Sequence, residues 1–116
     1  MINILFHKEL AGGRWFTLSL AEQLGNIGSE VGRASQWQGR EEKLFQEAVE
    51  RALELFDLTL ADSRWKGRLR EIARAREVFC DAVLGGNEYA SSMKDLNHYF
   101  LPFALDARNS LAKPLT

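Results

Sequence analysis

Arg76 is the residue whose type and position most clearly suggest chemistry. It falls in the middle of an apolar helical face, between Ile72 and Phe79. A guanidinium buried there needs a carboxylate partner, because an unpaired buried charge costs several kcal/mol. Glu30 and Asp57 lie at the edges of the apolar stripes of two earlier helices and could reach it. The expected role is a buried ion pair that fixes helix register. The alternatives are a pocket that binds an anion or a nucleotide, and a guanidinium that extends to solvent.

Other patterns that could support catalysis or metal binding are incomplete. Di-iron helical bundles use paired Glu-x-x-His motifs, and the nearest pattern here is Asp95-x-x-His98. The single cysteine, Cys80, falls on the core-facing side of its helix, where a thiol is normally unreactive. The sequence therefore predicts no catalytic residue, no metal site and no cofactor.

A run of basic residues could contact nucleic acid phosphates. Its members are Arg64, Lys66, Arg68, Arg70, Arg74 and Arg76. On a helix these charges spread around the axis instead of forming a stripe, and acidic residues interrupt and follow them. A solvated helix face is the expected interpretation, and an RNA-associated protein is the alternative.

Length, composition and charge are those of one ordinary soluble domain. The chain has 116 residues, of which 46% are hydrophobic and 27% charged. Fifteen Lys and Arg balance 16 Asp and Glu, so bulk charge gives no attraction to nucleic acid or to anionic membranes. A single cysteine suits a reducing compartment, and no apolar run approaches the ~20 residues of a membrane span. We expect a cytoplasmic protein that does not enter a membrane.

The N-terminal part of the chain combines an arm with a first helix. Residues 1–18 predict a short arm or helix that Trp15 and Phe16 anchor to the core. Ser19 followed by Glu22 has the pattern of a capping box, in which each side chain accepts a hydrogen bond from a free backbone N–H. The first main helix should therefore begin directly after Ser19 and end near Trp37.

Three more helices follow, and together the four predict an all-α fold. The expected segments are residues 41–61, residues 64–84 and a helix that begins near Met93. Their apolar residues recur at helical spacing, and the links between them are short. We expect an up-and-down four-helix bundle over residues 19–112, followed by a frayed tail at 113–116.

Small residues form a stripe along the first main helix. The stripe consists of Ala21, Gly25, Gly28, Gly32 and Ser35. Glycine within a helix costs roughly 0.5–1 kcal/mol relative to alanine, so the stripe needs a reason. We expect close packing against another helix backbone or a large aromatic ring, with a ligand-contact surface as the alternative.

The fourth helix has more apolar surface than a small bundle can bury. Its core stripe is expected to consist of Leu96, Phe100, Phe103, Ala107 and Leu111. Leu101 and Leu105 lie opposite this stripe, beside His98. Surplus apolar surface suggests a partner, most simply a second copy of the chain. The alternative is that Pro102 bends the helix and turns Leu105 inward.

In length, four-helix layout and the late Arg108-Asn109 pair, the chain resembles small bacterial helical bundles of the HEPN group, which accompany nucleotidyltransferases. Catalytic members carry an Arg followed after four to six residues by a His, and they cleave RNA. Here no His follows Arg108. The resemblance therefore implies a non-catalytic member that binds a partner protein, such as a nucleotidyltransferase, or a nucleotide.

The sequence thus favours a homodimeric, non-catalytic interaction module, with Leu101, Leu105 and His98 at its interface. The alternative is a small-molecule-binding bundle or enzyme with a pocket around Arg76 and Glu30.

Overall fold

The computed structural model describes residues 13–85, 95–96 and 98–100, and these residues form helices and turns without a strand. The all-α prediction is therefore confirmed. None of the helices described combines the length and the hydrophobicity that a membrane crossing requires. The predicted helix start at Met93, the bend at Pro102, the residues Leu101, Leu105 and Arg108, and the tail at 113–116 lie outside the described residues.

A short 3-10 helix, η1 (Arg14–Thr17), leads into the long helix α2 (Leu20–Trp37). The capping box is present: the Glu22 amide donates to the Ser19 hydroxyl at 3.1 Å, and the Ser19 amide donates to the Glu22 carboxylate at 3.0 Å. The start of α2 is therefore where the sequence places it. Trp15 is fully buried, as expected of an anchor.

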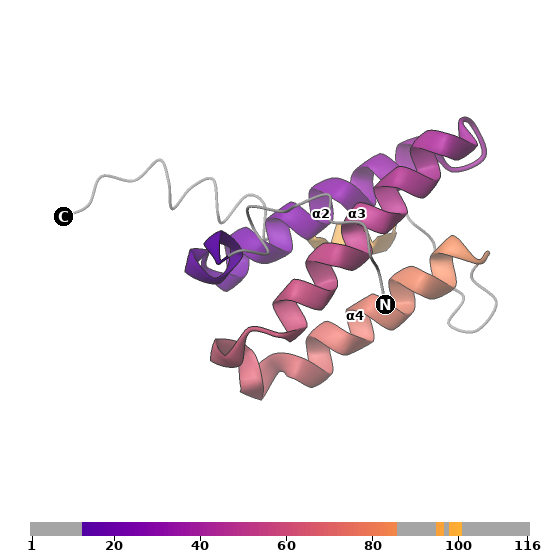
Figure 1. Ribbon diagram of the computed structural model, residues 1–116. Helices are drawn as coiled ribbons and strands as arrows, with labels where there is room; N and C mark the ends of the chain where they lie inside the picture. The colour runs from indigo at the N-terminus through magenta and orange to yellow at the C-terminus, as the bar shows by residue number, and fades with distance from the viewer. Residues whose placement is uncertain (1–12, 86–94, 97, 101–116) are drawn as a thin grey trace.

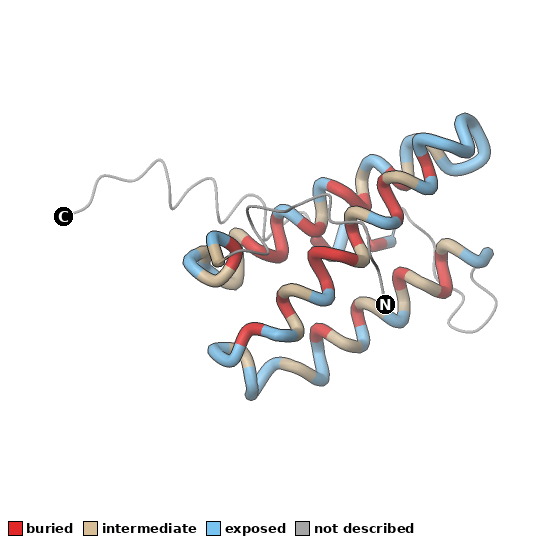
Figure 2. The backbone as a smooth tube through the Cα atoms, viewed as in Figure 1, coloured by how far each residue is buried: buried red, intermediate tan, exposed pale blue. Residues whose placement is uncertain are grey.

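Helix α3 (Glu42–Leu60) packs along α2 and forms the centre of the fold. The two helices run side by side in opposite directions in Figure 1, and Figure 2 shows buried residues along both of them. Gly39 in the connecting turn has a φ of 76°, a left-handed conformation that favours glycine. The two helices supply much of the buried core, including Leu24, Ile27, Val31, Ala34, Phe45, Ala48, Ala52, Leu55 and Phe56.

The third predicted helix is divided into a 3-10 turn, η2 (Ser63–Arg68), and the helix α4 (Leu69–Val83). The Asp62 side chain accepts from the Arg64 amide and caps η2. Trp65 has non-helical dihedral angles, φ −103° and ψ 25°, and its indole donates to Gln23 on α2. The α-helix begins only after this turn, at Leu69.

Helix α4 packs against α3, and the two diverge from their linked ends toward the C-terminal end of α4 (Figure 1). Residues 98–100 form a helical turn behind α2 and α3 in this view. Leu96 and Phe100 are buried, as predicted for the core stripe of the fourth helix. The ring of Phe56 lies 5.8 Å from that of Phe79 and 6.0 Å from that of Phe100, so this aromatic cluster joins the last described turn to α3 and α4.

Candidate functional site

Arg76, the leading candidate from the sequence, lies at the surface. Its Nε donates to Asp57 Oδ1 at 3.0 Å, so the predicted pairing with Asp57 is present. The two side chains are 33% and 49% exposed, however, and the expectation of a buried Arg76 is wrong. Arg76 occupies the edge of the buried stripe of α4, from which its long side chain reaches water. An ion pair this exposed contributes about 0.2–1 kcal/mol.

Glu30 belongs to a different ion-pair cluster. It is 7% exposed, and its two carboxylate oxygens accept from Arg33 Nη1 at 2.6 Å and from Arg51 Nε at 3.0 Å. These bonds link the middle of α2 to α3, which satisfies the buried charge. The structure therefore places Glu30 with Arg33 and Arg51, and places Arg76 with Asp57.

The largest buried polar network was not predicted, and Gln23 is at its centre. This side chain is fully buried, and its Nε2 donates to the Trp15 carbonyl at 2.9 Å and to Asp62 Oδ2 at 3.0 Å. Its Oε1 accepts from Trp65 Nε1 at 2.8 Å. Gln23 thus uses both ends of its amide to hold η1, α2 and η2 together. One signal was available: Gln23 falls one turn before Ile27, on the buried side of α2.

The indole N–H of Trp15 also has a buried side-chain acceptor. Trp15 Nε1 donates to the Thr59 hydroxyl at 3.1 Å, and that hydroxyl donates to the Leu55 carbonyl at 2.9 Å. Trp15 and Thr59 are both fully buried. These bonds attach η1 to the end of α3, and they give the network a structural role.

At the surface, the Arg64 side chain binds the network through Asp62. Its Nη2 donates to Asp62 Oδ2 at 2.7 Å and to the Leu18 carbonyl at 2.6 Å, and its guanidinium carbon lies 4.4 Å from the centre of the Trp65 ring. The hydrogen bonds from the Arg64 side chain lower the pKa of Asp62 from 3.8 to about 2. Burial acts in the opposite direction, and the bond from Gln23 adds to the lowering.

The basic run is partly neutralised by neighbouring carboxylates. Arg64 pairs with Asp62, and Arg68 Nε donates to Glu71 Oε2 at 2.9 Å. Arg74 also has an interaction partner. These pairs leave less unbalanced positive charge for phosphate than the sequence alone suggests.

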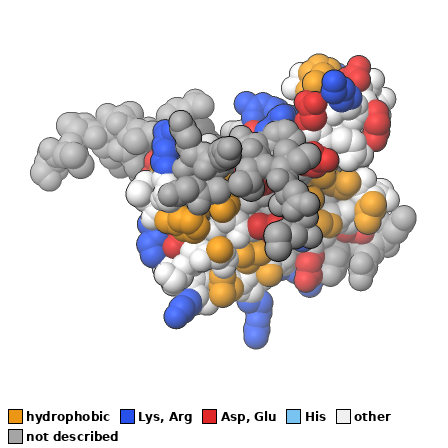
Figure 3. All heavy atoms as spheres, viewed as in Figure 1, with side chains coloured by type: hydrophobic (Ala, Val, Ile, Leu, Met, Phe, Trp, Pro, Cys, Tyr) orange, Lys and Arg blue, Asp and Glu red, His pale blue; other side chains and the backbone are white. Residues whose placement is uncertain are grey.

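Two apolar hollows adjoin α4, one on each flank. The first, which we call the α3–α4 hollow, has a volume of about 180 Å³ and opens between these two helices. It is lined by Val49, Leu53, Phe79, Cys80, Val83 and Leu84. Leu84 stands at its edge with 79% of its surface exposed. Hydrophobic side chains reach the surface over α3 and α4 in the view of Figure 3.

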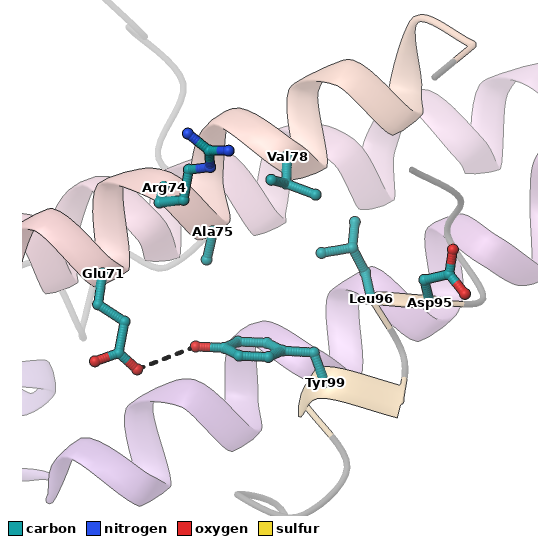
Figure 4. Close-up of a pocket in the computed structure, with 7 residues that line it drawn as sticks. All are labelled: Glu71, Arg74, Ala75, Val78, Asp95, Leu96 and Tyr99. Carbon is teal, nitrogen blue, oxygen red and sulfur yellow. Dashed lines mark hydrogen bonds between the residues drawn. The ribbon is translucent and has the colours of Figure 1, made fainter. Parts of the chain in front are cut away.

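The second hollow, which we call the Tyr99 pocket, lies between α4 and the residues Asp95, Leu96 and Tyr99, and has a volume of about 330 Å³. Its apolar walls come from Ala75, Val78, Leu96 and the ring of Tyr99 (Figure 4). Arg74, Asp95 and Leu96 of this lining were singled out from the sequence, but as parts of a basic run, an Asp-x-x-His pattern and a core stripe. The pocket itself was not predicted, because it forms only where α4 packs against a later helical segment.

The remaining sequence candidates are His98, Leu101, Leu105 and Cys80. His98 is exposed, and Leu101 and Leu105 fall outside the described residues. Cys80 is half-buried and lines the α3–α4 hollow. Within the part of the chain that the structure describes, no three His, Cys, Asp or Glu side chains are grouped as metal ligands would be.

Comparison with known proteins identifies no family for this chain. No protein-family model matches this chain, and neither a curated protein nor a solved structure matches it significantly. A function must therefore be argued from the surfaces themselves.

Proposed function

We propose that this chain is a non-catalytic interaction module that forms a homodimer through the α3–α4 hollow and Leu84. The observation that supports this most directly is the exposure of Leu84. A leucine with 79% of its surface in water stands at the edge of an apolar hollow of about 180 Å³. A projecting apolar side chain beside a matching hollow is the arrangement expected of a protein contact.

A second copy is the simplest partner because the projection and the hollow occupy the same surface. In a two-fold symmetric dimer the same patch is used by both subunits, so each Leu84 can enter the hollow of the other. The hollow is larger than a cavity of ~150 Å³ that accommodates benzene, so a leucine side chain fits. Burying Leu84 fully would contribute roughly 1.5–3 kcal/mol for each subunit.

The finer expectations from the sequence belong to the same proposal. The order of α2, α3 and α4, with Leu96 and Phe100 packed as a further helical segment, supports an up-and-down four-helix bundle. We place this bundle in the cytoplasm, since it has one cysteine and balanced charge. The resemblance to bundles of the HEPN group favours a nucleotidyltransferase as a further partner of the dimer.

The alternative of an anion or nucleotide pocket around Arg76 and Glu30 has less support. Arg76 already has Asp57 as its partner, and Glu30 has Arg33 and Arg51. A ligand anion at Arg76 would have to displace the Asp57 carboxylate.

Light scattering at micromolar concentration tests self-association. The proposal predicts a mass twice that of the 13.2 kDa chain, with a return toward the monomer on dilution. A monomer mass throughout the concentration range would contradict it.

A further inference from the structure

The Tyr99 pocket on the other flank of α4 has the size and the lining of a small-molecule site. Its volume of about 330 Å³ is at the lower end of the range for ligand pockets, and its walls are mainly apolar. Among the residues that the structure describes, it shares no lining residue with the α3–α4 hollow. A ligand here would therefore be independent of the proposed dimer contact.

The aromatic wall of the pocket is held in position before any ligand binds. The Tyr99 hydroxyl donates to Glu71 Oε1 at 3.2 Å, the bond drawn in Figure 4. Glu71 is in turn held by two hydrogen bonds from Arg68, at 2.9 and 3.2 Å. On its other side Tyr99 packs edge-to-face on Phe100, with ring centres 5.0 Å apart and planes at 82°. Such preorganisation reduces the entropy cost of binding.

The charged side chains at the rim already have partners. The hydrogen bonds from Arg68 lower the pKa of Glu71, whereas burial and the nearby Glu71 charge raise the pKa of Tyr99. Glu71 is thus ionised and Tyr99 neutral at physiological pH. Arg74 and Asp95 each have an interaction partner as well. A charged ligand would lose hydration without gaining an unpaired counter-ion, so the rim favours an uncharged molecule.

The volume sets the size of that molecule. At about 330 Å³ the pocket is roughly twice the ~150 Å³ cavity that holds one benzene ring. We propose that the Tyr99 pocket binds a small, uncharged, largely apolar molecule of about two aromatic rings, which packs on the Tyr99 ring between Val78 and Leu96.

Three probes with the same ring system test the proposal on the full chain. They are 1-naphthol, which is neutral, naphthalene-1-sulfonate, an anion, and 1-naphthylmethylammonium, a cation. Binding is followed by ligand-observed NMR titration. The proposal predicts saturable binding of 1-naphthol, with both ions weaker by about tenfold or more. Absence of saturable 1-naphthol binding, or equal binding of an ion, would overturn it.

A matched pair of variants locates the site. Val78→Trp fills the Tyr99 pocket, whereas Val83→Trp places the same ring in the α3–α4 hollow on the other flank of the same helix. Val78→Trp should weaken 1-naphthol binding by about tenfold or more, and Val83→Trp should leave it unchanged. The reverse pattern would refute the assignment. If Val78→Trp does not fold, methyl NMR shifts of Ala75 and Val78 in the natural protein decide: they move on binding if the pocket is the site, and stay fixed if it is not.

Discussion

The side chain of Phe100 lies in the groove that Gly28 leaves on the surface of α2. A Cβ atom added at Gly28 would lie 2.6 Å from the Cβ of Phe100 and 3.3 Å from its Cγ. Real Cβ atoms do not approach so closely, so the absence of a side chain at Gly28 allows this ring to pack. The contact attaches the last described helical turn to α2, and the same ring supports Tyr99 in its pocket.

Side chains at Gly28 should therefore destabilise the fold in proportion to their size. Gly28→Ala gains helix propensity but forces Phe100 outward, and we expect a net loss of about 1 kcal/mol in the free energy of unfolding. Gly28→Leu should lose about 2–4 kcal/mol. Urea unfolding monitored by circular dichroism measures both.

Gly67 supplies the control for this series. A Cβ at Gly67 would have no neighbour within 4 Å, and its φ is not in the left-handed region. Gly67→Ala should leave stability unchanged or raise it by about 0.5–1 kcal/mol. If Gly28→Ala were as well tolerated as Gly67→Ala, close packing of Phe100 on α2 would be wrong.

Replacing Gln23 should have a larger effect than its single side chain suggests. Gln23→Leu removes the donor to Trp15 and Asp62 and the acceptor for Trp65, all within the buried network. We expect a loss of about 2–4 kcal/mol in the free energy of unfolding, because the remaining buried groups are left unpaired. Gln46→Leu makes the same change on the exposed side of α3, where Gln46 bonds only to Glu42 among the contacts described. That control should stay within about 0.5 kcal/mol of the natural protein.

The network should also make stability depend on acid pH through Asp62. The pKa of this group is about 2 in the folded chain and 3.8 in the absence of its partners. Because the folded pKa is the lower one, the stabilisation is complete above pH 3.8 and disappears as the pH falls toward 2. We expect the ionised Asp62 side chain to contribute about 1–2 kcal/mol to the free energy of unfolding, because its partner Arg64 is partly open to solvent.

The variant Asp62→Asn isolates this contribution from other titrating carboxylates. Its stability should be below that of the natural protein at neutral pH, and the difference should shrink as the pH approaches 2. Urea titrations at a series of pH values give this difference. A difference that is independent of pH would show that the Asp62 charge does not stabilise the fold.

Local signals allowed the sequence to predict the helices. The bond pair between Ser19 and Glu22 involves residues three apart, and the apolar repeat of α3 needs only its own periodicity. The stripe around Gly28 indicated close packing against another helix backbone or a large aromatic ring, and at Gly28 the neighbour is the ring of Phe100. The partner itself was not predictable, because 72 positions separate the two residues.

The candidate site depended on tertiary geometry that periodicity does not contain. Arg76 lies near the centre of an idealised apolar face. In the structure, however, α4 is oriented so that Ile72, Ala75 and Phe79 are buried, and Arg76 lies at the edge of the buried face. The bond between Trp65 and Gln23 likewise spans two elements, and Trp65 lies in η2, where the sequence predicted the start of the third helix. The Tyr99 pocket and the α3–α4 hollow exist only once the helices have packed.

The proposed dimer surface is tested most directly by sedimentation velocity on three proteins: the natural chain, Leu84→Glu and Leu44→Glu. Leu84 and Leu44 are both exposed leucines, at 79% and 37%, but only Leu84 lines the α3–α4 hollow. The proposal predicts that the natural protein and Leu44→Glu sediment as dimers, while Leu84→Glu sediments as a folded monomer. A Leu84→Glu protein that remains dimeric at the same concentration would contradict it.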